Sequence, residues 1–133
     1  MTNPIEPDRQ KAKSLRDMAV ITLDRLDKTD KEKYPSNTLV DYYEIIHKLL
    51  ESLACIEGIK VRGEGAHSEL IDIICSIFKL ESNKREFMQE MRDYRNHISY
   101  EGFNIKAEYI KNRSGKIKEI IKELIDLINK KLK

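Results

Sequence analysis

The stretch PSNTLVDYYEIIHKLLESL, residues 35–53, decides the fold of this chain. Pro35 suits the first position of a helix, and Ser36 can accept a hydrogen bond from a free backbone N–H group there. Apolar residues then recur three and four positions apart, as they do along one side of an α-helix. They are Leu39, Tyr42, Tyr43, Ile46, Leu49, Leu50 and Leu53. The spacing predicts a long amphipathic helix in which both tyrosines pack in the core.

Four further segments show the same helical spacing. We expect helices at about residues 8–26, 67–79, 84–102 and from 106 onward. Ser82 and Asn83 can cap the helix that begins near Lys84, and Gly102 ends it. The 67–79 helix is apolar around most of its circumference, so we expect it to be the most buried element. The residues expected to face the core in these four helices are Leu15, Met18, Ala19, Thr22, Leu23, Leu26, Leu70, Ile71, Ile73, Ile74, Ile77, Phe78, Phe87, Met88, Met91, Ile110, Ile117, Ile120, Ile121, Leu124 and Ile128.

The composition agrees with helices rather than strands. Charged residues make up 36% of the chain and hydrophobic residues 40%, with only five Gly and three Pro. Three of the glycines, Gly58, Gly63 and Gly65, interrupt the helical pattern, and we expect residues 57–67 to form a loop. Short connections between amphipathic helices favour an all-α fold, an antiparallel up-and-down bundle of four to five helices. Its length predicts a single domain over residues 1–133.

The sequence carries no signal for a membrane or for export. No window is long and apolar enough for a transmembrane span, and the first ten residues lack the basic start and apolar run of a secretory signal. We therefore expect a cytoplasmic protein with no membrane association. Cys55 and Cys75 each lie within an apolar helical run, which predicts two small buried side chains rather than a disulfide.

The net charge of +2 is unevenly distributed along the chain. From Lys106 to the C-terminus, nine Lys and Arg face four Asp and Glu. A basic last helix is compatible with attraction to nucleic acid. Lysines near a helix C-terminus also favour solubility and complement the helix dipole. Both interpretations stay open.

A metal site is the first candidate for function. Glu44 and His47 have the Glu-x-x-His spacing of helical di-metal bundles, and Glu64 and His67 repeat it. Glu64 lies between two glycines in the expected loop, where the second pair would not converge. We expect His47 on a polar helix face with Glu44 and Glu51, and His67 at a helix start. No metal and no other cofactor are therefore expected.

The stretch MRDYRNHISYEG, residues 91–102, is the strongest candidate for chemistry. Arg92 is a permanent cation whose planar fork fits a phosphate, and His97 can both take and give a proton near neutral pH. A histidine can deprotonate the ribose 2′-OH for attack on the adjacent phosphorus while an arginine stabilises the added negative charge. Together the two residues could cleave RNA without a metal.

Helical geometry constrains this pair. Positions five apart differ by about 140° around a regular helix, so Arg92 and His97 do not share a face. Arg92 and Asn96, one turn apart, should be neighbours. A cleft formed where two copies of this helix end meet would bring both functions together and supply a second histidine as general acid.

An all-helical bundle of this length with RDYRNH near the end of its fourth helix resembles the HEPN superfamily, the helical domains of prokaryotic toxins and defence nucleases. The family signature is an Arg, a short variable spacer and a His, often with a polar residue directly after the Arg. Arg92, Asp93 and His97 occupy these positions. The resemblance implies a metal-independent endoribonuclease that works as a homodimer, with the two motifs facing each other across a shared cleft.

The resemblance also assigns roles and partners. Arg92, Asp93, Asn96 and His97 would form the catalytic group, with Asp93 and Asn96 as orienting residues, and Arg95 and Tyr100 would contact RNA. Some family members of the toxin–antitoxin type pair with a nucleotidyltransferase antitoxin that modifies a tyrosine after the His. Tyr100 stands one residue further from His97 than in that subgroup. The alternatives are a non-catalytic helical module that binds a protein partner or a nucleotide, and a metal-binding bundle.

Overall fold

The central helix of the fold is α2 (Pro35–Glu57), the segment with the clearest helical pattern. The computed structural model describes residues 2–133. In it α2 packs against all four other helices, α1 (Arg9–Asp27), α3 (Ala66–Ile77), α4 (Ser82–Glu101) and α5 (Ala107–Lys131). The predicted core residues of α2 are all fully buried. Burial of this apolar surface is the largest favourable term available to the fold.

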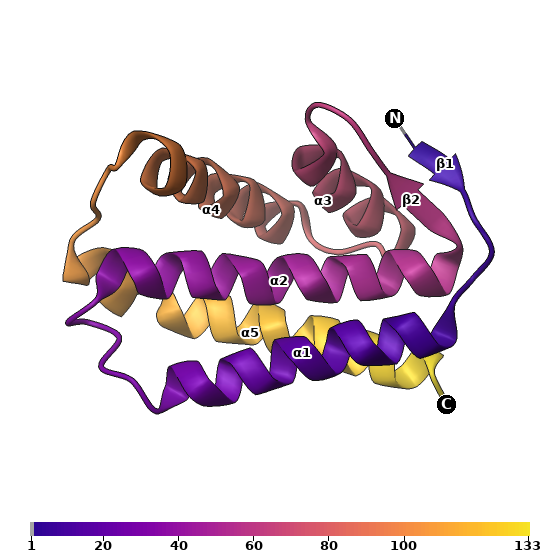
Figure 1. The fold of residues 1–133 in the computed structure, drawn as a ribbon, viewed down its shortest axis with the longest axis horizontal. Helices are drawn as coiled ribbons and strands as arrows, with labels where there is room; N and C mark the ends of the chain where they lie inside the picture. The colour runs from indigo at the N-terminus through magenta and orange to yellow at the C-terminus, as the bar shows by residue number, and fades with distance from the viewer. Residues whose placement is uncertain (1) are drawn as a thin grey trace.

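The helices alternate in direction, as predicted. Figure 1 shows α1, α2, α4 and α5 running up and down along one axis, with α1 and α5 on one side of α2 and α3 and α4 on the other. The shorter α3 covers the C-terminal part of α2. The all-α antiparallel bundle expected from the sequence is therefore confirmed.

Most helix ends follow the predicted signals. Asp8 caps α1 by accepting a hydrogen bond from the Lys11 backbone N–H at 2.9 Å. Pro35 stands at the first helical position of α2, and Gly102 ends α4 in the left-handed conformation with φ of 69°. The expected cap of α4 by Ser82 and Asn83 is wrong. Both lie inside the helix, because the Glu81 carbonyl already accepts the backbone N–H groups that follow them.

The expected distribution of burial needs two corrections. Helix α3 is not the most buried element, since α2 contributes many more buried residues and Ile77 of α3 is exposed. Helix α3 lies at the edge of the bundle, so one of its apolar sides faces solvent. Met18, expected to face inward, is exposed on α1. Both cysteines are buried and unbridged, as predicted. Within residues 2–133, no helix combines the length and apolarity needed to cross a membrane.

A small two-stranded sheet replaces part of the expected loop. Strand β1 (Thr2–Pro4) pairs antiparallel with β2 (Ile59–Val61), and Asn3 faces Lys60 in the register. Three-residue strands are too short to show alternation in a sequence, and the two partners are far apart along the chain. Gly58 makes the transition from α2 into β2 with φ of 70°, and its carbonyl accepts the Ile5 N–H at 2.8 Å.

Substitution of Gly58 should weaken the contact between the segment around Ile5 and the C-terminal end of α2. A Cβ there would lie 2.7 Å from the Ile5 carbonyl oxygen, in addition to the cost of a left-handed non-glycine residue. We expect Gly58→Ala to lower the free energy of unfolding by about 2–4 kcal/mol in a denaturant titration. Gly65→Ala is the matched control, because Gly65 has a similar φ of 73° and open space around its Cβ position. It should cost only about 1–2 kcal/mol, and equal losses would show that the contact with Ile5 does not matter.

Candidate functional site

The residues of the RDYRNH segment lie on the last turns of α4, and three of the six line one surface hollow. Arg92, Arg95, Asn96 and Tyr100 form its α4 side. The turn that precedes α3 and the first residues of α3, including His67, form the other side. The hollow has a volume of about 210 Å³. The fold thus joins the predicted substrate contacts Arg95 and Tyr100 with Arg92 and Asn96.

His97 does not line this hollow. Its side chain is 59% exposed, and Nδ1 bonds the Glu101 carboxylate one turn further along α4. Its ring meets the edge of the Phe103 ring, with centroids 6.3 Å apart. A single copy of the chain therefore presents Arg92 and His97 on different sides of the α4 end, as the helical spacing predicts.

Two further members of the predicted site contact arginines. Asp93 forms an ion pair with Arg92 at 2.9 Å, and Gln89 accepts a hydrogen bond from Arg92 Nε at 3.0 Å. Asp93 therefore holds Arg92 in place. Asn96 accepts a hydrogen bond from Arg95 Nη1 at 3.3 Å. No hydrogen bond joins Asn96 to Arg92 or His97 among the described residues.

Arg95 is the best-anchored residue of the hollow. Its Nη2 forms an ion pair with Glu44 of α2 at 2.8 Å. Its guanidinium lies over the rings of Tyr43 and Tyr100, 5.7 and 5.8 Å from their centroids. Its Nε is buried and has no hydrogen-bond partner in the described part of the chain. Arg95 therefore ties the end of α4 to the central helix.

A stacked pair of histidines that we did not predict lies beside this hollow. The rings of His47 and His67 are nearly parallel, with centroids 3.9 Å apart. The Tyr43 hydroxyl hydrogen-bonds His67 Nδ1 at 3.0 Å, and His47 Nε2 lies 3.4 Å from the Glu51 carboxylate. The expected position of His67 at a helix start is confirmed.

His47 shares a helix face with Glu51, as expected, but this face is not open to solvent. The His47 side chain is only 15% exposed, because α3 crosses this part of α2 and places His67 against it. The only signal in the sequence was the repeated Glu-x-x-His spacing of Glu44–His47 and Glu64–His67. We considered this repeat as a candidate metal-binding motif and not as a sign that the two histidines stack. The histidines of the two motifs do meet, but the two glutamates do not join them as ligands.

The geometry of the acids argues against a metal in this place. Glu44 points to Arg95, and Glu64 is exposed in the turn before α3. Within the part of the chain that the structure describes, no three His, Cys, Asp or Glu side chains are arranged to hold a metal ion. The two Glu-x-x-His motifs therefore do not bring their glutamates and histidines together as one ligand set.

The surroundings of the two imidazoles favour their neutral form. Burial lowers the pKa of His47 below the ordinary value of 6.5, against the opposing charge of Glu44. Burial also lowers the pKa of His67, and the adjacent His47 and Arg95 lower it further. Two neutral rings can stack closely, whereas two protonated rings would repel each other.

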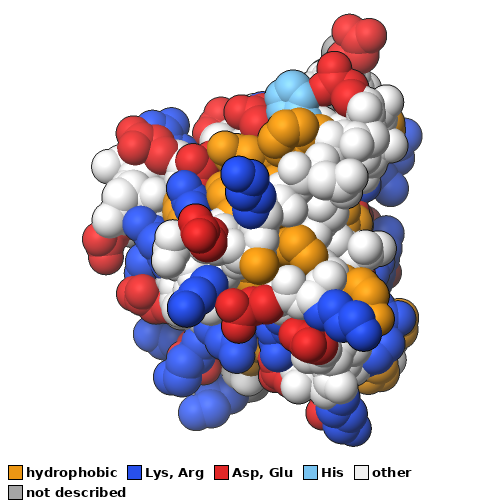
Figure 2. All heavy atoms as spheres, turned by 90° about the vertical axis from the view of Figure 1, so that its left-hand side faces the viewer, with side chains coloured by type: hydrophobic (Ala, Val, Ile, Leu, Met, Phe, Trp, Pro, Cys, Tyr) orange, Lys and Arg blue, Asp and Glu red, His pale blue; other side chains and the backbone are white. Residues whose placement is uncertain are grey.

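The end of the molecule that carries the α4 C-terminus has a mixed surface. Figure 2 shows basic and acidic side chains interspersed there, with small separate hydrophobic patches between them. A long stripe of one charge is absent from the face in this view. A nucleic acid bound at this face would be held by a few specific contacts rather than by a broad electrostatic field.

Comparisons of the chain with protein-family models, with curated proteins and with solved structures found no match.

The histidine pair should make stability depend on pH. Well above pH 6.5, the ordinary pKa of an imidazole, both rings are neutral in the folded and the unfolded chain, so they add no pH dependence. As the pH falls below that value, the unfolded chain binds protons that the folded chain resists, and the free energy of unfolding decreases. Denaturant titrations at several values between about pH 5 and 8 should show this loss, well above the ordinary range of carboxylates.

His47→Gln should flatten this pH profile, because it removes one ring of the stack. His97→Gln is the matched control, since His97 is exposed and has no imidazole neighbour among the described residues. A wild-type profile in His47→Gln would show that the pair does not set the pH dependence.

Proposed function

We propose that this protein is a metal-independent endoribonuclease of the HEPN type that acts as a homodimer. The observation that carries the proposal is the exposure of His97 together with its contact to Glu101. His97 is an exposed imidazole whose Nδ1 is bound by a carboxylate, and it lies on the same two helical turns as Arg92. This combination supplies a proton acceptor and a phosphate-binding cation at one end of the molecule.

Glu101 gives His97 the orientation that a general base needs. A carboxylate that accepts the Nδ1 proton leaves the lone pair on Nε2. Nε2 has no partner among the described residues and can take the proton of a ribose 2′-OH. The 2′-oxygen then attacks the adjacent phosphorus and the P–O5′ bond breaks. The products are a 2′,3′-cyclic phosphate and a 5′-hydroxyl end.

The leaving 5′-oxygen needs a proton, and the transition state needs a cation. In the proposed dimer His97 of the second copy donates this proton, and Arg92 stabilises the added negative charge on the phosphate. One copy alone presents Arg92 and His97 on different sides of α4. Two copies meeting at this end can place the arginine of one beside the histidine of the other.

Two exposed aromatic side chains support a contact at this end. Phe103 is 49% exposed and touches His97, and Tyr100 protrudes beside Arg95. Exposed rings beside a candidate site are typical of surfaces that bind a partner or stack on bases. In this proposal the protein is a cytoplasmic toxin or defence nuclease, and a nucleotidyltransferase antitoxin is one class of partner it could take.

One observation favours a second function, a non-catalytic module that binds a protein partner. Arg92 is already engaged by Asp93 and Gln89, and Arg95 by Glu44. Arginines held in this way can serve the fold alone. The same assay separates the two functions.

Ribonuclease activity in EDTA tests the proposal. We expect purified protein to cleave single-stranded RNA and to leave 2′,3′-cyclic phosphate ends. His97→Ala and Arg92→Ala should each reduce the rate by about 10²–10⁴-fold, since each removes a group that acts in the transition state. Arg25→Ala, an exposed arginine on α1, is the control and should keep full activity. Cleavage that is absent, or that persists in both site variants, refutes the nuclease and favours the binding module.

Light scattering tests the dimer. The protein should have about twice the chain mass of 15.6 kDa. Phe103→Glu should give a monomer with reduced ribonuclease activity, because it places a charge at the proposed contact. Ile21→Glu is the matched control, since Ile21 is 60% exposed but lies on α1. A wild-type monomer, or a dimer that survives Phe103→Glu, would remove the shared cleft at this end.

A further inference from the structure

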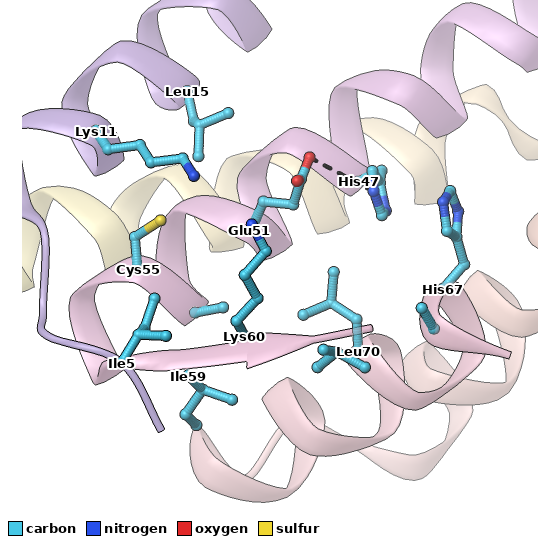
Figure 3. A pocket seen from close by; sticks show the side chains of 13 residues that line it. Ile5, Lys11, Leu15, His47, Glu51, Cys55, Ile59, Lys60, His67 and Leu70 are labelled. Atoms are coloured by element: carbon cyan, nitrogen blue, oxygen red, sulfur yellow. Dashed lines mark ion pairs between the residues drawn. The ribbon is translucent and has the colours of Figure 1, made fainter. Parts of the chain in front are cut away.

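A second pocket lies away from the α4 motif, where the two-stranded sheet meets the helices. It has a volume of about 180 Å³ and lies between α1, α2, β2 and the first turns of α3 (Figure 3). None of Arg92, Asn96 and His97 lines it. We refer to it as the ribbon pocket. A ligand here would not contact these three residues of the proposed nuclease site, although Ala66 and His67 line both hollows.

The walls of the ribbon pocket are largely apolar. They are formed by Ile5, Leu15, Ala54, Ile59, Val61 and Leu70. These residues come from separate segments of the chain, so the pocket exists only in the folded molecule. Apolar walls with a few converging polar groups are typical of small-molecule sites.

Two lysines supply the polar groups that remain available. Lys11 comes from α1 and Lys60 from β2, and both line the pocket. Neither ammonium group forms an ion pair within the described chain. Both lysines line the same pocket as the buried Cys55 sulfur, so the two cations belong to one region. Burial raises the pKa of the Cys55 thiol; the positive charges of Lys11 and Lys60 oppose this shift, and the negative charges of Asp8 and Glu51 add to it.

The one carboxylate that lines the ribbon pocket, that of Glu51, already contacts His47. Glu51 lies 3.4 Å from His47 Nε2, and Figure 3 shows the Lys11 nitrogen reaching from α1 toward it without an ion pair. Lys11 and Lys60 therefore line the pocket without an ion-pair partner in the described chain. The carboxylate of a bound ligand between them would supply that partner.

We propose that the ribbon pocket binds a small organic acid with an apolar body, its carboxylate between Lys11 and Lys60 and its body against the aliphatic walls. The size of the pocket sets the ligand class. A cavity of roughly 150 Å³ holds one benzene ring, so this pocket takes a single ring or a short branched chain. It is too small for a ligand that contains both a sugar and a base.

Benzoate and benzamide are matched probes for this site. They have the same ring and nearly the same shape, but only benzoate carries a charge. We expect benzoate to bind the full chain at millimolar concentration and to shift the backbone amide NMR signals of Cys55, Lys60 and Ala66. Benzamide should bind about tenfold more weakly, because it cannot pair with two ammonium groups. Equal affinities, or shifts that map elsewhere, would overturn the proposal.

Lysine variants test the two cations directly. Lys11→Met and Lys60→Met keep the apolar stems and should each weaken benzoate binding about threefold to fivefold, with little effect on benzamide. Lys13→Met, an exposed lysine on the same helix that does not line the pocket, should bind benzoate as the wild type does. Unchanged benzoate affinity in both pocket variants refutes the site, and the comparison of the two probes on the wild type stands even if a variant unfolds.

Discussion

The burial of most of α2 beneath four other helices is the constraint on which the rest of the structure depends. A helix with apolar residues around most of its surface cannot remain in water, and four other helices pack against it. Tyr43 shows how this burial leads to the candidate sites. Its ring is in the core and lies beneath Arg95, while its hydroxyl reaches His67. The central helix therefore positions side chains from both α3 and α4.

Polar groups gather where the second layer of the bundle crosses α2. Glu44, His47 and Glu51 lie on the side of α2 that α3 and α4 cover, so they cannot all remain in solvent. Each finds a partner: Arg95 for Glu44, His67 for His47, and His47 for Glu51. Polar groups that leave water are generally paired in this way. His47 Nδ1 is the exception in this set, since it is buried and has no hydrogen-bond partner in the described part of the chain. The same crossing leaves a hollow on each side of His67, one near α4 and the ribbon pocket near the sheet.

The α4 end contrasts with this paired region. His97 is exposed and oriented only by Glu101, and Phe103 lies against it in solvent. Such residues contribute little to the packing of one copy. The proposed nuclease assigns these residues a role in contacts with a second copy of the chain or with an RNA strand.

The sequence by itself determined the helices, their approximate limits and the bundle, because helical spacing and end signals are local properties of the chain. It also predicted that Arg92 and His97 lie on different sides of α4, since that follows from helical geometry alone. Only the tertiary structure decided the pairing of Thr2–Pro4 with Ile59–Val61, the exposure of Met18 and the stacking of His47 on His67. Each of these depends on which distant segment packs against a given face, and no local pattern records that choice.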